Sequence, residues 1–150
     1  MKEDITNSRI AILNFSTLGL KSIYGKIIAD RLSESFYINN NFAVVDRALI
    51  NNSSKQQNLT STEYLSSDQI KQIGFSLKAD YIIIGKIEKI QQNNILNQKD
   101  ERVELNLSFR FISVKSNDII GMVSYLCSDK DINSALSLAV RDISVHLRNE

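Results

Sequence analysis

Cysteine and histidine are almost absent from the chain: its 150 residues include one of each, Cys127 and His146. A single cysteine excludes an intrachain disulfide, and the two residues together are too few for a structural zinc site or another transition-metal site. The charges balance as well, with 18 basic and 17 acidic side chains. Without a basic excess we expect neither nucleic-acid binding through phosphates nor attraction to a membrane through a polybasic patch.

Long apolar runs are missing too. No stretch approaches the roughly 18 apolar residues of a transmembrane helix. Residues 1–8 are polar and lack the apolar core of a signal peptide. The composition, 43% hydrophobic and 23% charged, is typical of a globular protein. We therefore expect a flexible N-terminus at residues 1–8 and one α/β domain over residues 9–150.

The first third of the chain has the pattern of a strand, a helix and a strand. Residues 9–15 form a short apolar run, typical of a buried strand, before a Ser-Thr-Leu-Gly turn. Residues 23–38 carry apolar side chains at helical spacing, with Ser22 as a candidate N-cap and three asparagines, residues 39–41, as the stop. Residues 42–46 predict a second strand. The short joints imply that the two strands pair in parallel.

Two further helices follow in the sequence. Residues 48–56 predict a short helix, and the polar residues after it predict an exposed loop. Ser66 and Gln69 have the spacing of a capping box, in which each side chain bonds the backbone of the other residue. The helix that they begin should reach about Lys78.

The second half of the chain predicts three consecutive strands and a final helix. Residues 80–90 are apolar on both faces in their first half, so this strand should be central, with Ile82, Ile83 and Ile84 buried. Residues 91–101 are a polar connection, residues 102–111 alternate almost perfectly between apolar and polar side chains, and residues 119–126 follow a turn. Residues 131–147 have helical spacing. The order βαβααβββα predicts a mixed sheet with helices packed on it.

No catalytic signature is present. The chain lacks the GxxxxGK[ST] and GxGxxG phosphate-binding loops and the GxSxG nucleophile turn. The loop formed by residues 16–19, Ser-Thr-Leu-Gly, sits where doubly wound proteins bind phosphates. It has one glycine, and Lys21 is the only cation near it, so an ordinary connection is the simpler interpretation.

Single residues that could carry chemistry also have simpler roles. Cys127 ends an apolar strand, as a small buried residue would, and no activating base is evident near it. His146 lies in the last turn of the final helix, where it suits a surface or capping role. Asp46-Arg47 and Asp80 stand at strand boundaries, where we expect helix capping and a local ion pair.

Asp129 and Asp131 could contribute to a carboxylate site for calcium or magnesium, but they more simply cap the last helix. We therefore predict no catalytic, cofactor-binding or metal site, and no enzymatic activity.

Several motifs resemble the CsgG family, which includes the curli-secretion lipoprotein CsgG, the flagellar accessory protein FlgO and the penicillin-binding-protein activator LpoB. The most specific pair is VVDR at residues 44–47 and ADYIIIG at residues 79–85. Further matching positions are Tyr24, Gly25, residues 29–32, Leu49, Gln57, Leu59, Ser66 and Gly74. The resemblance covers about residues 9–90 and implies an α/β fold like LpoB and the TolB N-terminal domain.

The resemblance implies a non-enzymatic accessory protein of the bacterial envelope that binds a protein partner in secretion, flagellar or peptidoglycan machinery. A periplasmic place at the outer membrane would follow, through a signal and lipid anchor upstream of Met1. The candidate insertion sites at residues 16–22 and 91–101 are short and polar, so we expect no pore hairpins and no direct membrane insertion. We expect either a weak homo-oligomer or a partner that docks near the three consecutive strands and the final helix. The alternative is a cytoplasmic domain that binds a nucleotide or another small ligand.

Overall fold

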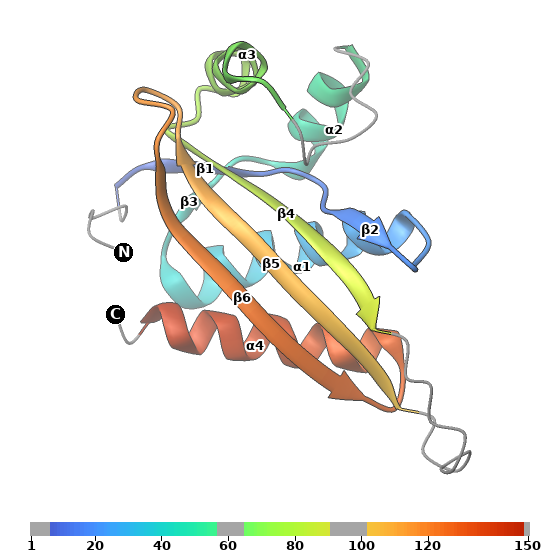
Figure 1. The fold of residues 1–150 in the computed structure, drawn as a ribbon. Helices are drawn as coiled ribbons and strands as arrows, with labels where there is room; N and C mark the ends of the chain where they lie inside the picture. The colour runs from blue at the N-terminus through green and yellow to red at the C-terminus, as the bar shows by residue number, and fades with distance from the viewer. Residues whose placement is uncertain (1–6, 57–64, 91–101, 149–150) are drawn as a thin grey trace.

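A computed structural model describes residues 7–56, 65–90 and 102–148 of the chain (Figure 1). In chain order the elements are β1 (Arg9–Ile12), β2 (Ser16–Leu18), α1 (Ile23–Asn40), β3 (Ala43–Val44), α2 (Arg47–Gln56), α3 (Ser67–Leu77), β4 (Tyr81–Ile90), β5 (Val103–Ser113), β6 (Ile119–Asp129) and α4 (Ile132–Arg148). The expected connection at residues 91–101, the loop after α2 and most of the N-terminal segment lie outside the described residues.

The sheet is mixed, as the sequence predicts, with strand order β3-β1-β4-β5-β6. β1 pairs in parallel with both β3 and β4, which makes the β1-α1-β3 segment the expected parallel unit. β4, β5 and β6 form an antiparallel meander. The predicted central position of β4 is confirmed, since it has strands on both sides.

The expectation of a simple loop at residues 16–19 is wrong. Residues Ser16–Leu18 form a strand, β2, that pairs in parallel with residues 86–88 of β4. β4 is ten residues long, whereas β1 covers only its first few residues, so the rest of this edge is available for pairing. β2 satisfies backbone groups that would otherwise be exposed on a central strand.

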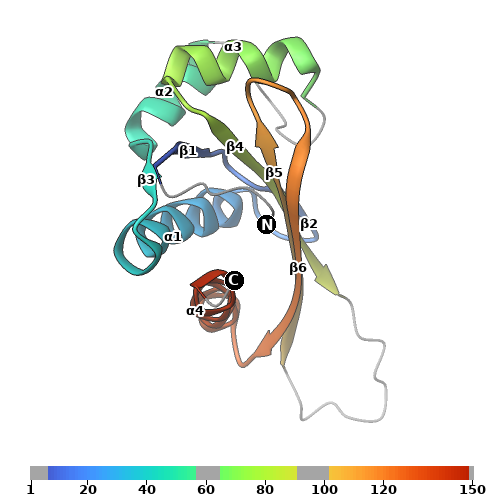
Figure 2. The ribbon, with the colours of Figure 1, turned by 90° about the vertical axis from the view of Figure 1, so that its left-hand side faces the viewer.

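The two faces of the sheet carry separate cores. On one face, α1 and α4 cover side chains that include Ile83 and Ile87; on the other, α2 and α3 cover Ile82 and Ile84 (Figure 2). All four isoleucines are buried, which confirms the prediction for the start of β4. The alternation in β5 is confirmed as well, because Leu105, Leu107, Phe109 and Phe111 all lie in the core beneath α1 and α4.

Some of the helix ends form the capping structures that the sequence predicts, and one does not. Ser66 and Gln69 form the predicted capping box: each side chain accepts a hydrogen bond from the backbone N–H of the other. Asn41 ends α1 in the left-handed conformation, close to the predicted stop. Ser22 stands before α1 as expected, but its side chain makes no capping bond because its backbone is already helical. None of the described helices is long and apolar enough to span a membrane.

Candidate interaction surfaces

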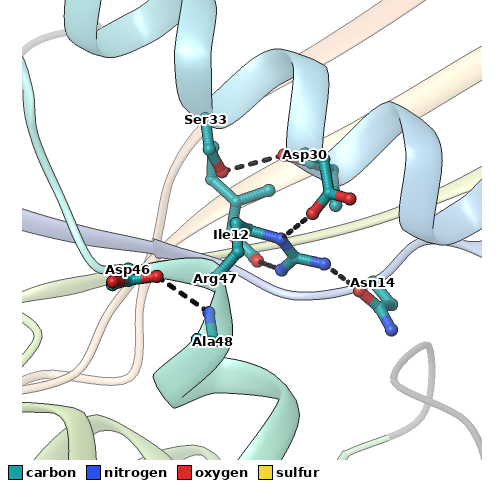
Figure 3. A network of polar contacts seen from close by, with 8 residues as sticks. Ile12, Asn14, Asp30, Ser33, Asp46, Arg47 and Ala48 are labelled. Carbon is teal, nitrogen blue, oxygen red and sulfur yellow. Dashed lines mark hydrogen bonds and ion pairs between the residues drawn. The ribbon is translucent and has the colours of Figure 1, made fainter.

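An open α/β sheet usually binds a ligand where the order of its parallel strands reverses, which here is the carboxyl end of β1, between β3 and β4. Here the guanidinium group of Arg47 occupies that place (Figure 3). Its Nε donates to Asp30 Oδ1 of α1 at 2.7 Å, and its other nitrogens donate to the Ile12 carbonyl and Asn14 Oδ1. With only 13% of its side chain exposed, Arg47 joins β1, α1 and α2, and its donors are taken up by protein acceptors instead of facing a ligand.

The local ion pair expected at Asp46-Arg47 does not form between these two neighbours. Arg47 pairs with Asp30, 17 residues before it, and not with its neighbour Asp46. Asp46 instead caps α2, because its Oδ1 accepts from the Ala48 backbone N–H at 2.9 Å. Capping at this position was expected for Asp46, but the partner of Arg47 depends on how α1 packs.

Asp80 has a structural role at the start of β4. Its Oδ2 accepts from the Arg9 backbone N–H at 2.9 Å, and its own N–H donates to the Arg9 carbonyl at 2.8 Å. Its carbonyl accepts from the Val114 N–H at 3.0 Å. Asp80 thus ties the ends of three strands together.

Cys127 is buried, as predicted, and its thiol lies 3.7 Å from the Leu105 carbonyl. Burial raises the pKa of this thiol to about 11, and the nearby carboxylates of Asp129 and Asp142 add to the effect. The thiol is protonated at neutral pH, which is the opposite of what a nucleophile needs. His146 is exposed near the end of α4.

The carboxylates at the start of α4 act on the backbone. Asp131 Oδ1 accepts from the Ser134 N–H at 2.7 Å, which confirms the predicted cap, and this bond lowers the pKa of Asp131. Asp129 Oδ1 accepts from the adjacent Lys130 N–H and does not cap the helix. Across the described residues there is no cluster of three or more His, Cys, Asp or Glu side chains that could hold a metal ion.

A groove of about 820 Å³ lies between α3, the start of β4 and the end of β5. Phe75 on α3 lines it with 74% of its side chain exposed, the highest value among the exposed large apolar residues. Lys71, Lys78 and Lys115 line the same groove, and Asp80 is its one acidic residue. We call this surface the Phe75 groove. An exposed aromatic ring among cations is a feature that sequence periodicity did not reveal.

A second surface is the half of the sheet that α2 and α3 leave uncovered, on the lower right of Figure 2. Met122 and Leu126 of β6 are 71% and 64% exposed there. A hollow of about 260 Å³ lies beside them, lined in part by Lys86, Ser108 and Arg110. We call this surface the open face. Large apolar side chains gathered on one exposed face commonly mark a site of protein–protein contact.

Structural comparison shows the same fold in bacterial lipoproteins and related proteins. Lipoprotein GNA1162 from Neisseria meningitidis matches with a TM-score of 0.64 and 14% identity over 95% of this chain and 99% of that chain. The LpoB C-terminal domain from Salmonella enterica matches with a TM-score of 0.56 and 16% identity over 83% and 85%. PelC from Paraburkholderia phytofirmans, a dodecamer, matches with 0.58 and 12% over 95% and 86%.

At these identities the similar structures establish the fold alone. No curated protein matches the sequence. The family model of the peptidoglycan-synthase activator LpoB, however, matches residues 19–120, more than half of the chain. That stretch runs from the residue after β2 to the start of β6 and includes Arg47 and, apart from Ser8, the residues that line the Phe75 groove. The expected resemblance is thus shown for LpoB, whose name describes a regulator of an enzyme rather than an enzyme. The chain belongs to the LpoB family of peptidoglycan-synthase activators.

Proposed function

We propose that this protein binds a peptidoglycan synthase of the bacterial envelope and regulates its activity without catalysing a reaction itself. The family match over residues 19–120 carries the proposal. The side chains agree with it, because Arg47 fills the usual ligand position and the Cys127 thiol is protonated and buried. The wider kinship with CsgG and FlgO, and a periplasmic place at the outer membrane through an upstream lipid anchor, belong to the same proposal.

The Phe75 groove is the surface that we assign to the synthase. Aromatic side chains contribute disproportionately to binding energy when a partner buries them, and Phe75 is ready to be buried. The lysines around it favour a partner whose contact region is acidic, because complementary charge speeds association and fixes its orientation. A synthase segment that offers carboxylates around an apolar pocket would fit.

Binding and activation can be measured together with purified synthases from the same organism. We expect saturable binding and a faster rate of glycan polymerisation when the protein is added. Phe75→Ala should weaken binding about tenfold or more, equivalent to about 1.4 kcal/mol. Tyr37→Ala is the matched control, since Tyr37 is exposed on α1, on the opposite face of the sheet. If no synthase binds and no rate changes, the proposal is wrong; if both variants bind alike, the groove is not the site.

The cytoplasmic ligand-binding alternative has its own test. Thermal denaturation with ATP, GTP, calcium, magnesium or zinc should show no saturable stabilisation. A ligand present at 100 times its dissociation constant would add about 2.7 kcal/mol to the free energy of unfolding, an effect that is easily detected. A clear stabilisation by any of these would favour the alternative over the regulator.

A further inference from the structure

β6 is the last strand of the sheet, and its outer side is unpaired within the described residues. Figure 2 looks onto this edge and shows no helix or strand in front of it. Eleven residues of extended chain, Ile119–Asp129, thus present a row of backbone N–H and C=O groups to the outside. Such a row readily pairs with another strand.

The strand lacks the usual protection against that pairing. Edge strands are commonly blocked by proline, by charged side chains or by bulges. β6 contains no proline, and no charged residue occurs from residue 119 to residue 128. Its one irregularity, opposite Phe111 and Ile112, lies at the start of the strand. The stretch from Gly121 to Asp129 therefore remains regular and can be paired.

The exposed side chains make this edge complementary to itself. When a two-fold axis relates two antiparallel strands, the residue numbers of each opposed pair add up to the same value, which is twice the number of the residue on the axis. With the axis at Ser124, Met122 of one copy meets Leu126 of the other, and Val123 meets Tyr125. An axis at Val123 or at Tyr125 would instead place Met122 opposite a serine. Only the axis at Ser124 pairs the two most exposed apolar side chains of β6 with each other at both ends.

The charges at the two ends of the stretch are compatible with this arrangement. Asp129 is the last residue of β6 and Lys130 follows it, while Lys115 and Asp118 lie in the turn that precedes the strand. The two-fold axis brings the end of one copy toward the turn of the other. Each end then holds both signs of charge, and the seven central residues, 121–127, hold none. In this register Lys130 of one copy lies opposite Asp118 of the other, so charges of opposite sign meet at each end.

We propose that two copies of this protein associate through their β6 strands, paired antiparallel about Ser124, so that one sheet continues across the dimer. The pairing extends the open face over both copies and buries Met122 and Leu126 against their counterparts. The pairing is made by β6, whereas Phe75 lies on α3, so the dimer does not depend on binding to a synthase.

A cysteine at the axis tests the register directly. In Ser124→Cys the two thiols would belong to opposed residues, about 4.5–5.5 Å apart at their Cα atoms, which suits a disulfide. We expect mild oxidation to convert this variant to a covalent dimer. Ser108→Cys, on the neighbouring strand β5, should remain a monomer under the same denaturing electrophoresis, as should the native chain with its buried Cys127. Equal cross-linking of the two variants would overturn the register.

A charge pair tests it without covalent chemistry. By light scattering or sedimentation, the native chain should dimerise at high micromolar concentration, and Met122→Lys or Leu126→Glu alone should weaken dimerisation about tenfold. The double variant should recover it, since each introduced lysine then faces an introduced glutamate of the other copy. A strict monomer, or a dimer that neither single variant weakens, would refute the proposal. So would a monomer in which the variants abolish only the binding of a synthase.

Discussion

Phe15 lies between two glycines that allow close approach to it. At Gly25, in the first turn of α1, a Cβ atom would stand 1.8 Å from the Phe15 carbonyl oxygen, and the Phe15 N–H donates to the Gly25 carbonyl at 3.1 Å. At Gly85 of β4, a Cβ would stand 2.6 Å from the Phe15 ring and 2.7 Å from the Phe109 Cβ. Gly85, the last residue of ADYIIIG, therefore makes room for the ring of Phe15, a residue in the connection between β1 and β2.

Gly85→Ala should destabilise the fold. The added methyl group would clash with the buried Phe15 ring and with the Cβ atom of Phe109. Such overpacking should lower the free energy of unfolding by about 1–3 kcal/mol. Chemical denaturation measures this loss. The double variant Gly85→Ala with Phe15→Leu should lose less than the sum of its two single variants, because the smaller side chain relieves the contact. Strict additivity would contradict this account of Gly85.

Arg47→Lys should also lower stability although it keeps the charge. One ammonium group cannot replace a planar guanidinium that donates to Asp30, Ile12 and Asn14 from three nitrogens. We expect a loss of about 2 kcal/mol in urea denaturation, a typical value for partly buried bonds to a charged group. The control, Arg141→Lys, affects only an exposed ion pair with Asp142 at 3.4 Å and should change stability by less than about 0.5 kcal/mol. Equal effects would show that the Arg47 network is not structural.

At the scale of elements, two serines that precede helices offer a matched test of capping. Ser66→Ala removes the side-chain oxygen that accepts from the Gln69 N–H and should cost about 1 kcal/mol in thermal or urea unfolding. Ser22→Ala should be nearly neutral, because Ser22 makes no capping bond at α1. If the two substitutions cost the same, helix propensity rather than the capping box governs α3.

β4 is the element on which both cores are built. Ile83→Ala should cost roughly 2–5 kcal/mol, the range for truncating a fully buried aliphatic side chain. Leu18→Ala on β2 is the control for an exposed strand position, with an expected change within about 0.5 kcal/mol. A loss below about 0.5 kcal/mol for Ile83→Ala in chemical denaturation would show that β4 does not organise the sheet.

At the scale of the whole molecule, stability should fall at alkaline pH. Burial and the hydrogen bond from its hydroxyl to Asp142 raise the pKa of Tyr125 from 10.0 to about 12. The pKa of Cys127 rises from 9.0 to about 11. Well below pH 9.0, the pKa of the unfolded thiol, both groups are protonated in the folded and unfolded chains, so their contribution to stability is constant. Above it the unfolded chain loses these protons first, which favours unfolding until the folded pKa values are passed.

Urea denaturation at neutral pH and at about pH 10 measures this difference. The native chain should be less stable at the higher pH, and the double variant Tyr125→Phe with Cys127→Ala should show a smaller decrease. A decrease of the same size in both would assign the alkaline sensitivity to other groups. The two residues lie on β6 and face α4, so the test reports on the contact between these elements.

Much of the fold could be predicted because its signals are local. The alternation in residues 103–111 decides which side chains face the core, since successive residues of a strand point to opposite faces. The capping box needs only Ser66 and Gln69, three residues apart. With one cysteine and one histidine in the chain, a transition-metal site could be argued against from the composition alone.

What depends on long-range packing could not be predicted in this way. Arg47 pairs with Asp30, which lies 17 positions earlier in the chain. The buried hydroxyl groups of Ser35 on α1 and Ser144 on α4 are hydrogen-bonded at 2.5 Å, although the two residues are 109 positions apart. β2 pairs with the part of β4 that extends past the end of β1, a contact that depends on the tertiary arrangement of the strands. The sequence by itself determined the elements and the faces that they bury, because those follow from neighbours along the chain. The tertiary structure decided which surfaces stay exposed, the Phe75 groove and the edge of β6, because exposure depends on where each helix ends over the sheet.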